Sequence, residues 1–101
     1  MKLAYIAGPY RAGHGRTVRE NIRSAEIVAL KYWKLGYAVI CPHLNTAFFD
    51  GEAEDSIWLE GDLEILRRCD VIVLMKNWHE SSGAKEERRL AKSLGKEIIE
   101  E

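Results

Sequence analysis

Residues 71–94 include the apolar run Val71-Ile72-Val73-Leu74-Met75 and, six residues later, the stretch Ser81-Ser82-Gly83-Ala84-Lys85-Glu86-Glu87-Arg88-Arg89-Leu90-Ala91-Lys92-Ser93-Leu94. The first run is short and rich in β-branched residues, which is typical of a strand buried on both faces. The second begins with residues that cap helices well and continues with apolar residues at helical spacing. We therefore predict a buried strand followed by a helix that begins near Ser82.

The rest of the chain repeats this alternation of strand and helix. We predict strands at Leu3–Ala7, 37–41, 71–75 and 96–99, helices at 17–35 and 56–69, and a long irregular loop over 42–55. The first helix ends at Gly36, and its predicted inner face consists of Val18, Ile22, Ala25, Ala29, Tyr32 and Trp33. Alternating strands and helices predict a parallel sheet with right-handed crossovers. We expect one domain over 1–101, a three-layer α/β/α, flavodoxin-like or Rossmann-like fold of four to five strands with the first strand central.

Two helices each place an acidic residue on the face that should be buried. Glu87 lies within roughly 20° of the centre of the stripe formed by Ala84, Leu90, Ala91 and Leu94, with Glu86 near the edge of that stripe. Asp62 lies in the middle of the face formed by Trp58, Leu59, Ile65, Leu66 and Cys69. An unpaired buried charge costs several kcal/mol, so such a residue is paired, protonated or functional. A simple ion pair between Glu87 and a neighbouring arginine is the alternative interpretation.

In a parallel α/β sheet, ligands bind at the carboxyl ends of the strands, where segments 8–16, 42–55 and 76–83 should meet. The first segment carries Gly8, Gly13 and Gly15, whose backbone N–H groups can face an anion, together with Arg11 and Arg16. The segment lacks the P-loop ending, and a plain flexible turn remains open. Tyr5 lies inside the first strand, where a buried phenol needs a partner such as a helix carboxylate.

The aromatic residues of the second rim segment point to a flat ligand. Phe48, Phe49 and Trp58 can stack on a nucleobase, although they can equally belong to the core. The pair Cys41-x-His43 has no second ligand pair at zinc spacing, so we expect no metal. No cofactor is expected either.

Composition limits the partners and the compartment. The net charge of -1 gives no general attraction to nucleic acid polymers or anionic membranes, and no apolar run approaches the length of a membrane span. Cys41 and Cys69 show no disulfide framework, which suits a reducing cytoplasm. A domain this small buries a limited core, and the aromatic residues of loop 42–55 favour a homodimer or a higher homo-oligomer.

Three motifs together resemble the nucleoside 2-deoxyribosyltransferase superfamily, which includes the 2'-deoxynucleoside 5'-phosphate N-hydrolases. They are Tyr5-Ile6-Ala7-Gly8-Pro9-Tyr10, then Asp62-Leu63 followed by Cys69-Asp70, then Ser81-x-Gly83-x-x-x-Glu87-x-x-x-Ala91. The resemblance spans nearly the whole chain. It implies that Glu87 is the nucleophile, that Asp62 is the acid/base residue and that Tyr5 orients the nucleophile.

Within that superfamily, the chain has features of the phosphate-accepting hydrolases. Transferases of free nucleosides usually carry an acid where this chain has Ser81, and Arg11 lies in a hydrolase-like Gly-x-x-Arg-x-Gly loop. Loop 42–55 belongs to neither subgroup. The resemblance and the rim position together make the following residues candidates for substrate binding: Gly8, Arg11, Gly13, His43, Asn45, Phe48, Trp58, Ser81 and Gly83.

We therefore expect an enzyme that cleaves the N-glycosidic bond of a nucleotide or nucleoside, by hydrolysis or base exchange, with a (deoxy)nucleoside 5'-monophosphate as substrate. Burial should raise the pKa of Asp62 so that it carries a proton, whereas Glu87, near a helix N-terminus, should stay ionised. The alternative is a nucleotide-binding or sensor module without turnover. A flavodoxin-type flavin carrier is disfavoured because the first loop lacks a hydroxyl-rich phosphate cradle.

Overall fold

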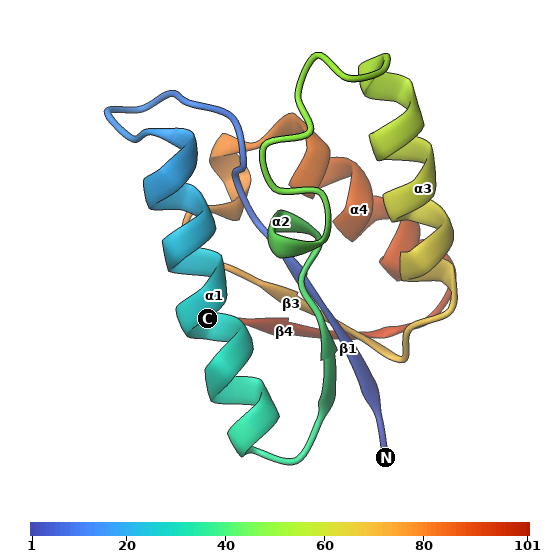
Figure 1. Ribbon diagram of the computed structural model, residues 1–101. Helices are drawn as coiled ribbons and strands as arrows, with labels where there is room; N and C mark the ends of the chain where they lie inside the picture. The colour runs from blue at the N-terminus through green and yellow to red at the C-terminus, as the bar shows by residue number, and fades with distance from the viewer.

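A computed structural model describes residues 1–101 and shows a four-stranded parallel sheet in the order β2-β1-β3-β4. The strands are β1 (Leu3–Ala7), β2 (Ala38–Ile40), β3 (Val71–Leu74) and β4 (Glu97–Glu100). The predicted parallel sheet is confirmed, and β1 is an interior strand, as expected (Figure 1). The chain leaves β1 toward β2 on one side and later returns to β3 on the other side, so the strand order reverses at the β1–β3 boundary.

The helices cover both faces of this sheet and form the three predicted layers (Figure 1). Helix α1 (Val18–Lys34) packs on one face, while α3 (Asp55–Arg67) and α4 (Ser82–Ser93) pack on the other. Successive residues of β1 serve the two layers alternately, because side chains alternate across a strand. Ala4 and Ile6 join the core on the α1 side, whereas Tyr5 and Ala7 join the core beneath α3 and α4.

Local sequence signals explain where the helices begin. Thr17 caps α1 and forms a reciprocal capping box with Glu20. Ser81 caps α4, since its hydroxyl accepts a hydrogen bond of 3.0 Å from the backbone N–H of Ala84. The prediction of an irregular loop over 42–55 was wrong for its first residues, which form a short helix, α2 (Pro42–Asn45). Proline suits the first turn of a helix, where its missing N–H has no partner to lose.

Three apolar residues assigned to inner helix faces are exposed instead. Trp33 directly follows the buried Tyr32 in the last turn of α1, and one residue further along a helix rotates the side chain by about 100°. Leu94 is the cap residue beyond the end of α4, and Leu59 lies beside the cavity described below. The helical pattern therefore identified the buried face correctly but made it too wide.

The two thiols are buried inside the fold and form no disulfide. Cys41 follows β2 and Cys69 lies between α3 and β3. Burial raises the pKa of each thiol to about 11. Both cysteines therefore behave as small apolar core residues at neutral pH. None of the helices has the length and apolar character needed to cross a membrane.

Candidate active site

A cavity of about 450 Å³ opens at the carboxyl ends of β1 and β3, where the strand order reverses. Its walls come from the loop after β1, from α2, from one side of α3 and from the first two turns of α4. Parallel α/β folds bind ligands at this position because the connections there diverge and leave a crevice. Most of the predicted site residues line this cavity, namely Gly8, Arg11, Gly13, His43, Trp58, Asp62, Ser81, Gly83 and Glu87.

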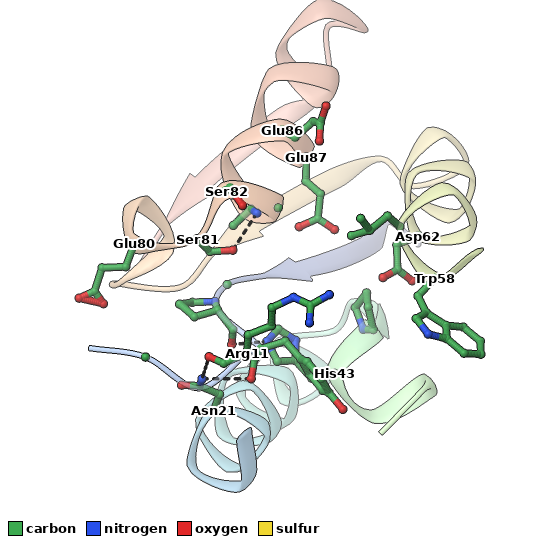
Figure 2. A pocket seen from close by; sticks show the side chains of 18 of the residues that line it. Arg11, Asn21, His43, Trp58, Asp62, Glu80, Ser81, Ser82, Glu86 and Glu87 are labelled. Carbon is green, nitrogen blue, oxygen red and sulfur yellow. Dashed lines mark hydrogen bonds between the residues drawn. The ribbon is translucent and has the colours of Figure 1, made fainter. Parts of the chain in front are cut away.

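Glu87 reaches the cavity from the second turn of α4 (Figure 2). The hydroxyl of Tyr5, buried in β1, donates a hydrogen bond to Oε2 of Glu87. Glu87 forms no ion pair with an arginine, so the alternative interpretation of its inward position as one half of a simple ion pair is wrong. Burial and the nearby Glu87 charge raise the pKa of the Tyr5 phenol, so it remains a hydrogen-bond donor.

Asp62 extends into the same cavity from the middle of α3 (Figure 2). Its side chain is half-buried and makes no hydrogen bond or ion pair within the chain. Burial raises the pKa of its carboxyl to about 6. Asp62 can therefore hold or release a proton near neutral pH, which a general acid or base requires.

The expected protonation of Glu87 was wrong. Burial, followed by the charges of Asp62 and Glu86, raises the pKa of Glu87 to about 8, and only the Tyr5 hydrogen bond acts in the opposite direction. The positive end of a helix dipole acts mainly within the first turn, and Glu87 lies beyond it. Desolvation therefore dominates, so Glu87 holds a proton to higher pH than Asp62 does.

Gly8 begins the first loop at a point where the chain has no room for a side chain. A Cβ atom on Gly8 would lie 2.3 Å from Sδ of Met75 and 2.9 Å from its Cβ. The ends of β1 and β3 therefore approach closely beneath the cavity. This close approach gives Gly8 a structural role in addition to its predicted position in the site.

Asn21 is a residue of the site that the sequence analysis missed. Its buried side chain donates hydrogen bonds to the carbonyl oxygens of Tyr10 (3.2 Å) and Arg11 (3.0 Å), and so fixes the first loop against α1. Its Oδ1 accepts from Nε of Arg16 at 2.9 Å. The signal was present, because Asn21 lies four residues before the inward-facing Ala25 and is therefore a polar residue on the buried face of α1.

The two arginines of the first loop have different environments. Arg16 also donates to the carbonyl of Glu20 (3.0 Å) and to the hydroxyl of Ser24, so its guanidinium is engaged in holding α1. Arg11 extends into the cavity (Figure 2). It forms an ion pair of 2.5 Å with Asp55 at the start of α3. Both members of that pair are more than half exposed. Arg11 is therefore the arginine that a ligand can recruit.

His43 also holds the first loop. Its ring is buried, burial lowers its pKa, and Nε2 lies 2.8 Å from the carbonyl oxygen of Pro9. A carbonyl oxygen can only accept a hydrogen bond, so Nε2 carries the proton of the neutral ring. Nδ1 is then a hydrogen-bond acceptor, and it has no partner in the chain. The buried indole N–H of Trp58 likewise has no partner, and Phe49 packs edge-to-face on that ring with 5.6 Å between centroids.

The structure does not bring Asn45 and Phe48 to the cavity. Both are exposed, because α2 turns the chain outward before the loop continues. The backbone N–H of Phe48 donates to the hydroxyl of Tyr10, whose own proton goes to Asp50. Tyr10 thereby ties the loop to the rim through the backbone of Phe48 and the side chain of Asp50, and the ring of Phe48 remains outside the cavity.

The N-terminus of α4 supplies free hydrogen-bond donors. The N–H of Ala84 is taken by the Ser81 hydroxyl, whereas the N–H groups of Ser82 and Gly83 make no hydrogen bond within the chain. Both residues line the cavity. Unpaired N–H groups at the start of a 12-residue helix favour a negatively charged group.

Comparison with known proteins identifies the fold and a family. A solved structure described as a 2-desoxiribosyltransferase from Leishmania mexicana is similar, with 20% identity and a TM-score of 0.67. The match covers 99% of this chain and 63% of that one, so the chain spans less than two thirds of that enzyme's length. At this identity the likeness shows a shared fold. No curated protein matches the sequence. The family model described as a domain of unknown function (DUF4406) matches residues 2–100, and the chain therefore belongs to the DUF4406 family.

Proposed function

We propose that the protein cleaves the N-glycosidic bond of a nucleotide or nucleoside, with Glu87 as the nucleophile. The observation that carries this proposal is that two carboxylates, Asp62 and Glu87, line one cavity. Tyr5 donates a hydrogen bond to Glu87 and so fixes its position. A purely binding module has no need of two partly desolvated acids. The fold likeness to a deoxyribosyltransferase and the motif resemblance support the same reaction class.

In the proposed reaction, a carboxylate oxygen of Glu87 attacks the anomeric carbon as the carbon–nitrogen bond breaks. The electron pair of that bond goes to the departing base, and Asp62 gives the base a proton. Water, or a second base, then attacks the glycosyl ester and releases Glu87, with Asp62 taking up the proton of the attacking group. The Tyr5 hydroxyl fixes the Glu87 carboxylate during both steps.

This mechanism needs Glu87 ionised and Asp62 protonated. In the free protein, the pKa values of about 8 for Glu87 and about 6 for Asp62 favour the opposite distribution of the proton near neutral pH. The productive form is then a minor fraction of the free protein, in equilibrium with the dominant one. Two interacting acids titrate as a pair, so the pH dependence of turnover reports on both of them together.

We further propose that 5'-monophosphates are preferred over free nucleosides. The support is the free N–H groups of Ser82 and Gly83, the Ser81 hydroxyl, and Arg11 extending into the same cavity. Arg16 is not part of this site, because α1 engages its guanidinium. Asp55 competes with a phosphate for Arg11, which makes free nucleosides the second candidate substrate class.

A panel of nucleosides and their 5'-monophosphates, scored for released free base, tests the reaction. Release from any member supports a glycosidase, and addition of a second base distinguishes base exchange from hydrolysis. Binding of a panel member without base release would favour the nucleotide-binding alternative. No binding and no release across the panel would remove the proposed substrate class altogether.

Arg11→Ala tests the phosphate site. A charge-assisted contact to phosphate is worth about 1.5–3 kcal/mol, so kcat/KM for the monophosphate should fall roughly ten- to a hundredfold while the nucleoside rate stays unchanged. Arg89→Ala is a matched control, because Arg89 is exposed on α4 and does not line the cavity. Equal losses on both substrates would place the phosphate elsewhere.

We also propose that the protein acts as a homodimer or a higher homo-oligomer. Eleven large apolar side chains are exposed on a chain of 101 residues, and they gather mainly on α1 and around segment 44–59. Apolar surface that clusters in this way marks interaction sites.

A further inference from the structure

Helix α1 carries a second apolar side that the core does not use. Ile27 is 55%, Leu30 53% and Trp33 54% exposed, and their spacing of three residues places them along one side of the helix. The side that faces the sheet is formed by the buried residues Asn21, Ala25, Ala29 and Tyr32. A surface helix of a monomer normally has one apolar stripe, and α1 has two. We call Ile27, Leu30 and Trp33 the outer stripe.

Nothing else in the chain covers the outer stripe. Helices α3 and α4 share the opposite face of the sheet, and α1 has only the short α2 beside it (Figure 1). None of the three residues lines the cavity of the candidate active site, so a ligand bound there does not cover the stripe either. Exposed apolar residues that line up in this way indicate contact with another macromolecule.

We propose that the outer stripe is the dimer interface, in which α1 of one copy packs antiparallel against α1 of a second copy with Leu30 on the two-fold axis. A two-fold interface must complement itself, so residues equally far from the axis in opposite directions meet. Ile27 then meets Trp33 of the second copy, and Leu30 meets its own equivalent. In this register each of the three residues of the outer stripe has an apolar partner in the second copy.

The charges beside the stripe agree with this register. Glu26 and Lys34 lie equally far from Leu30, so each Glu26 faces Lys34 of the second copy. Lys34 has no ion pair within its own chain, and Glu26 is paired only with the exposed Arg23 of its own helix. A parallel arrangement would instead place Glu26 beside Glu26 and Lys34 beside Lys34. Charge complementarity therefore selects the antiparallel pairing.

The apolar cluster around segment 44–59 is the competing surface. It consists of Phe48, Phe49, Ile57 and Leu59. Leu59 lines the cavity and Phe49 packs on Trp58, which also lines it, so a bound ligand can cover part of this cluster. No ligand can cover the outer stripe in this way. The proposed interface also does not depend on the reaction proposed above. The two surfaces can therefore be tested separately.

The first test is the molar mass measured by light scattering at micromolar concentration. The wild type should show twice the chain mass of 11.5 kDa, and Leu30→Glu should show a single chain. Placing two glutamates against each other on the axis should raise the dissociation constant at least about a hundredfold. Leu94→Glu is the matched control, since Leu94 is similarly exposed but lies beyond α4, and its mass should stay that of the dimer. Circular dichroism melting should show that Leu30→Glu remains folded.

A monomeric wild type, or a dimer that survives Leu30→Glu, would overturn the proposal. A dimer that Phe48→Glu dissociates while Leu30→Glu leaves it intact would assign the interface to the competing surface.

The second test addresses the register. Leu30→Cys should form a disulfide between two copies on oxidation, because a residue on a two-fold axis meets itself, whereas Leu94→Cys should not. The native thiols are buried and do not compete. Glu26→Lys and Lys34→Glu should each weaken the dimer, and the double exchange should restore it. A double exchange that remains weaker than both single variants would exclude the antiparallel pairing.

Discussion

The two walls of the cavity are built in opposite ways. One wall carries Asp62 and Glu87, which come from two helices on the same face of the sheet, and Tyr5 of β1 is buried behind Glu87 and donates to it. The other wall is the loop from Gly8 to Arg16, whose contacts across the rim are made by exposed side chains such as Arg11 and Asp55. We call these the acid wall and the loop wall.

Burial controls the charges of the acid wall, whereas solvent controls those of the loop wall. The pKa values of Asp62 and Glu87 are both raised mainly by desolvation. The Arg11–Asp55 pair is more than half exposed, and exposed pairs contribute little free energy. The comparison suggests that the acid wall sets the type of reaction, while the loop wall selects the ligand at small cost in stability. Four predictions test this difference.

Glu87→Gln should give the largest effect. Replacing the proposed nucleophile should remove the covalent step while preserving the shape of the side chain, so kcat for base release should fall about a thousandfold or more. Substrate binding, measured by equilibrium dialysis, should be retained. A rate within about tenfold of the wild type would show that the acid wall does not carry the chemistry.

Asp62→Asn should lower kcat/KM by about 10²- to 10³-fold and change the shape of its pH dependence. The wild type should show a bell with limbs near pH 6 and pH 8, from the pKa values of Asp62 and Glu87. In the variant only Glu87 titrates, so the rate should rise with pH to a plateau. The midpoint should lie below 8, because the Asp62 charge no longer raises the pKa of Glu87. A bell that persists unchanged would contradict the assignment.

The acid wall should also make stability fall as pH rises. Between the ordinary pKa of glutamate near 4.5 and the value of about 8 in the folded protein, the folded chain keeps a proton on Glu87 that the unfolded chain has released. The unfolded state then binds fewer protons, so the free energy of unfolding decreases with pH over this window, by about 2–4 kcal/mol.

Urea unfolding of Glu87→Gln between pH 5 and pH 8 should show this decrease largely removed. Glu86→Gln is the matched control, since Glu86 is the exposed neighbour on the same helix, and its pH dependence should resemble that of the wild type. A wild type whose stability rises with pH across this window would mean that Glu87 is not desolvated.

The loop wall should respond more weakly. Asp55→Asn frees Arg11, and exposed ion pairs are worth about 0.2–1 kcal/mol, so the affinity for a 5'-monophosphate should rise about 1.4- to fivefold. Asp50→Asn is the control, because Asp50 lines the same cavity but accepts from Tyr10. In an Arg11→Ala background the gain from Asp55→Asn should vanish. A gain that persists there would indicate general charge repulsion in place of competition for Arg11.

The same contrast explains what the sequence could predict. Helical periodicity placed Glu87 and Asp62 on inward faces, because a helix pattern is local and α4 and α3 have nearly their predicted bounds. Asn21 could have been found in the same way, as a polar residue among Val18, Ala25 and Ala29. An uncharged amide is a weaker signal than a carboxylate on such a face, because burying it costs less free energy.

The partners of the loop residues could not be predicted from local pattern. Arg11 and Arg16 look alike in the sequence, but one extends into the cavity and the other folds back onto α1. The acceptor of Arg11 is Asp55, which is 44 residues away in the sequence. Asn45 and Phe48 were expected at the ligand because α2 was not foreseen. The protonation of Glu87 depended on how deeply α4 packs, which spacing alone does not reveal.

The two buried thiols make the molecule convenient to label. With pKa values of about 11, Cys41 and Cys69 are almost entirely protonated at pH 7, with about one thiol in ten thousand ionised. A cysteine introduced at an exposed position such as Ile57 would have an ordinary pKa and would react with maleimide far faster. A fluorophore attached there, beside the rim, would report ligand entry in real time without any need to remove the native cysteines.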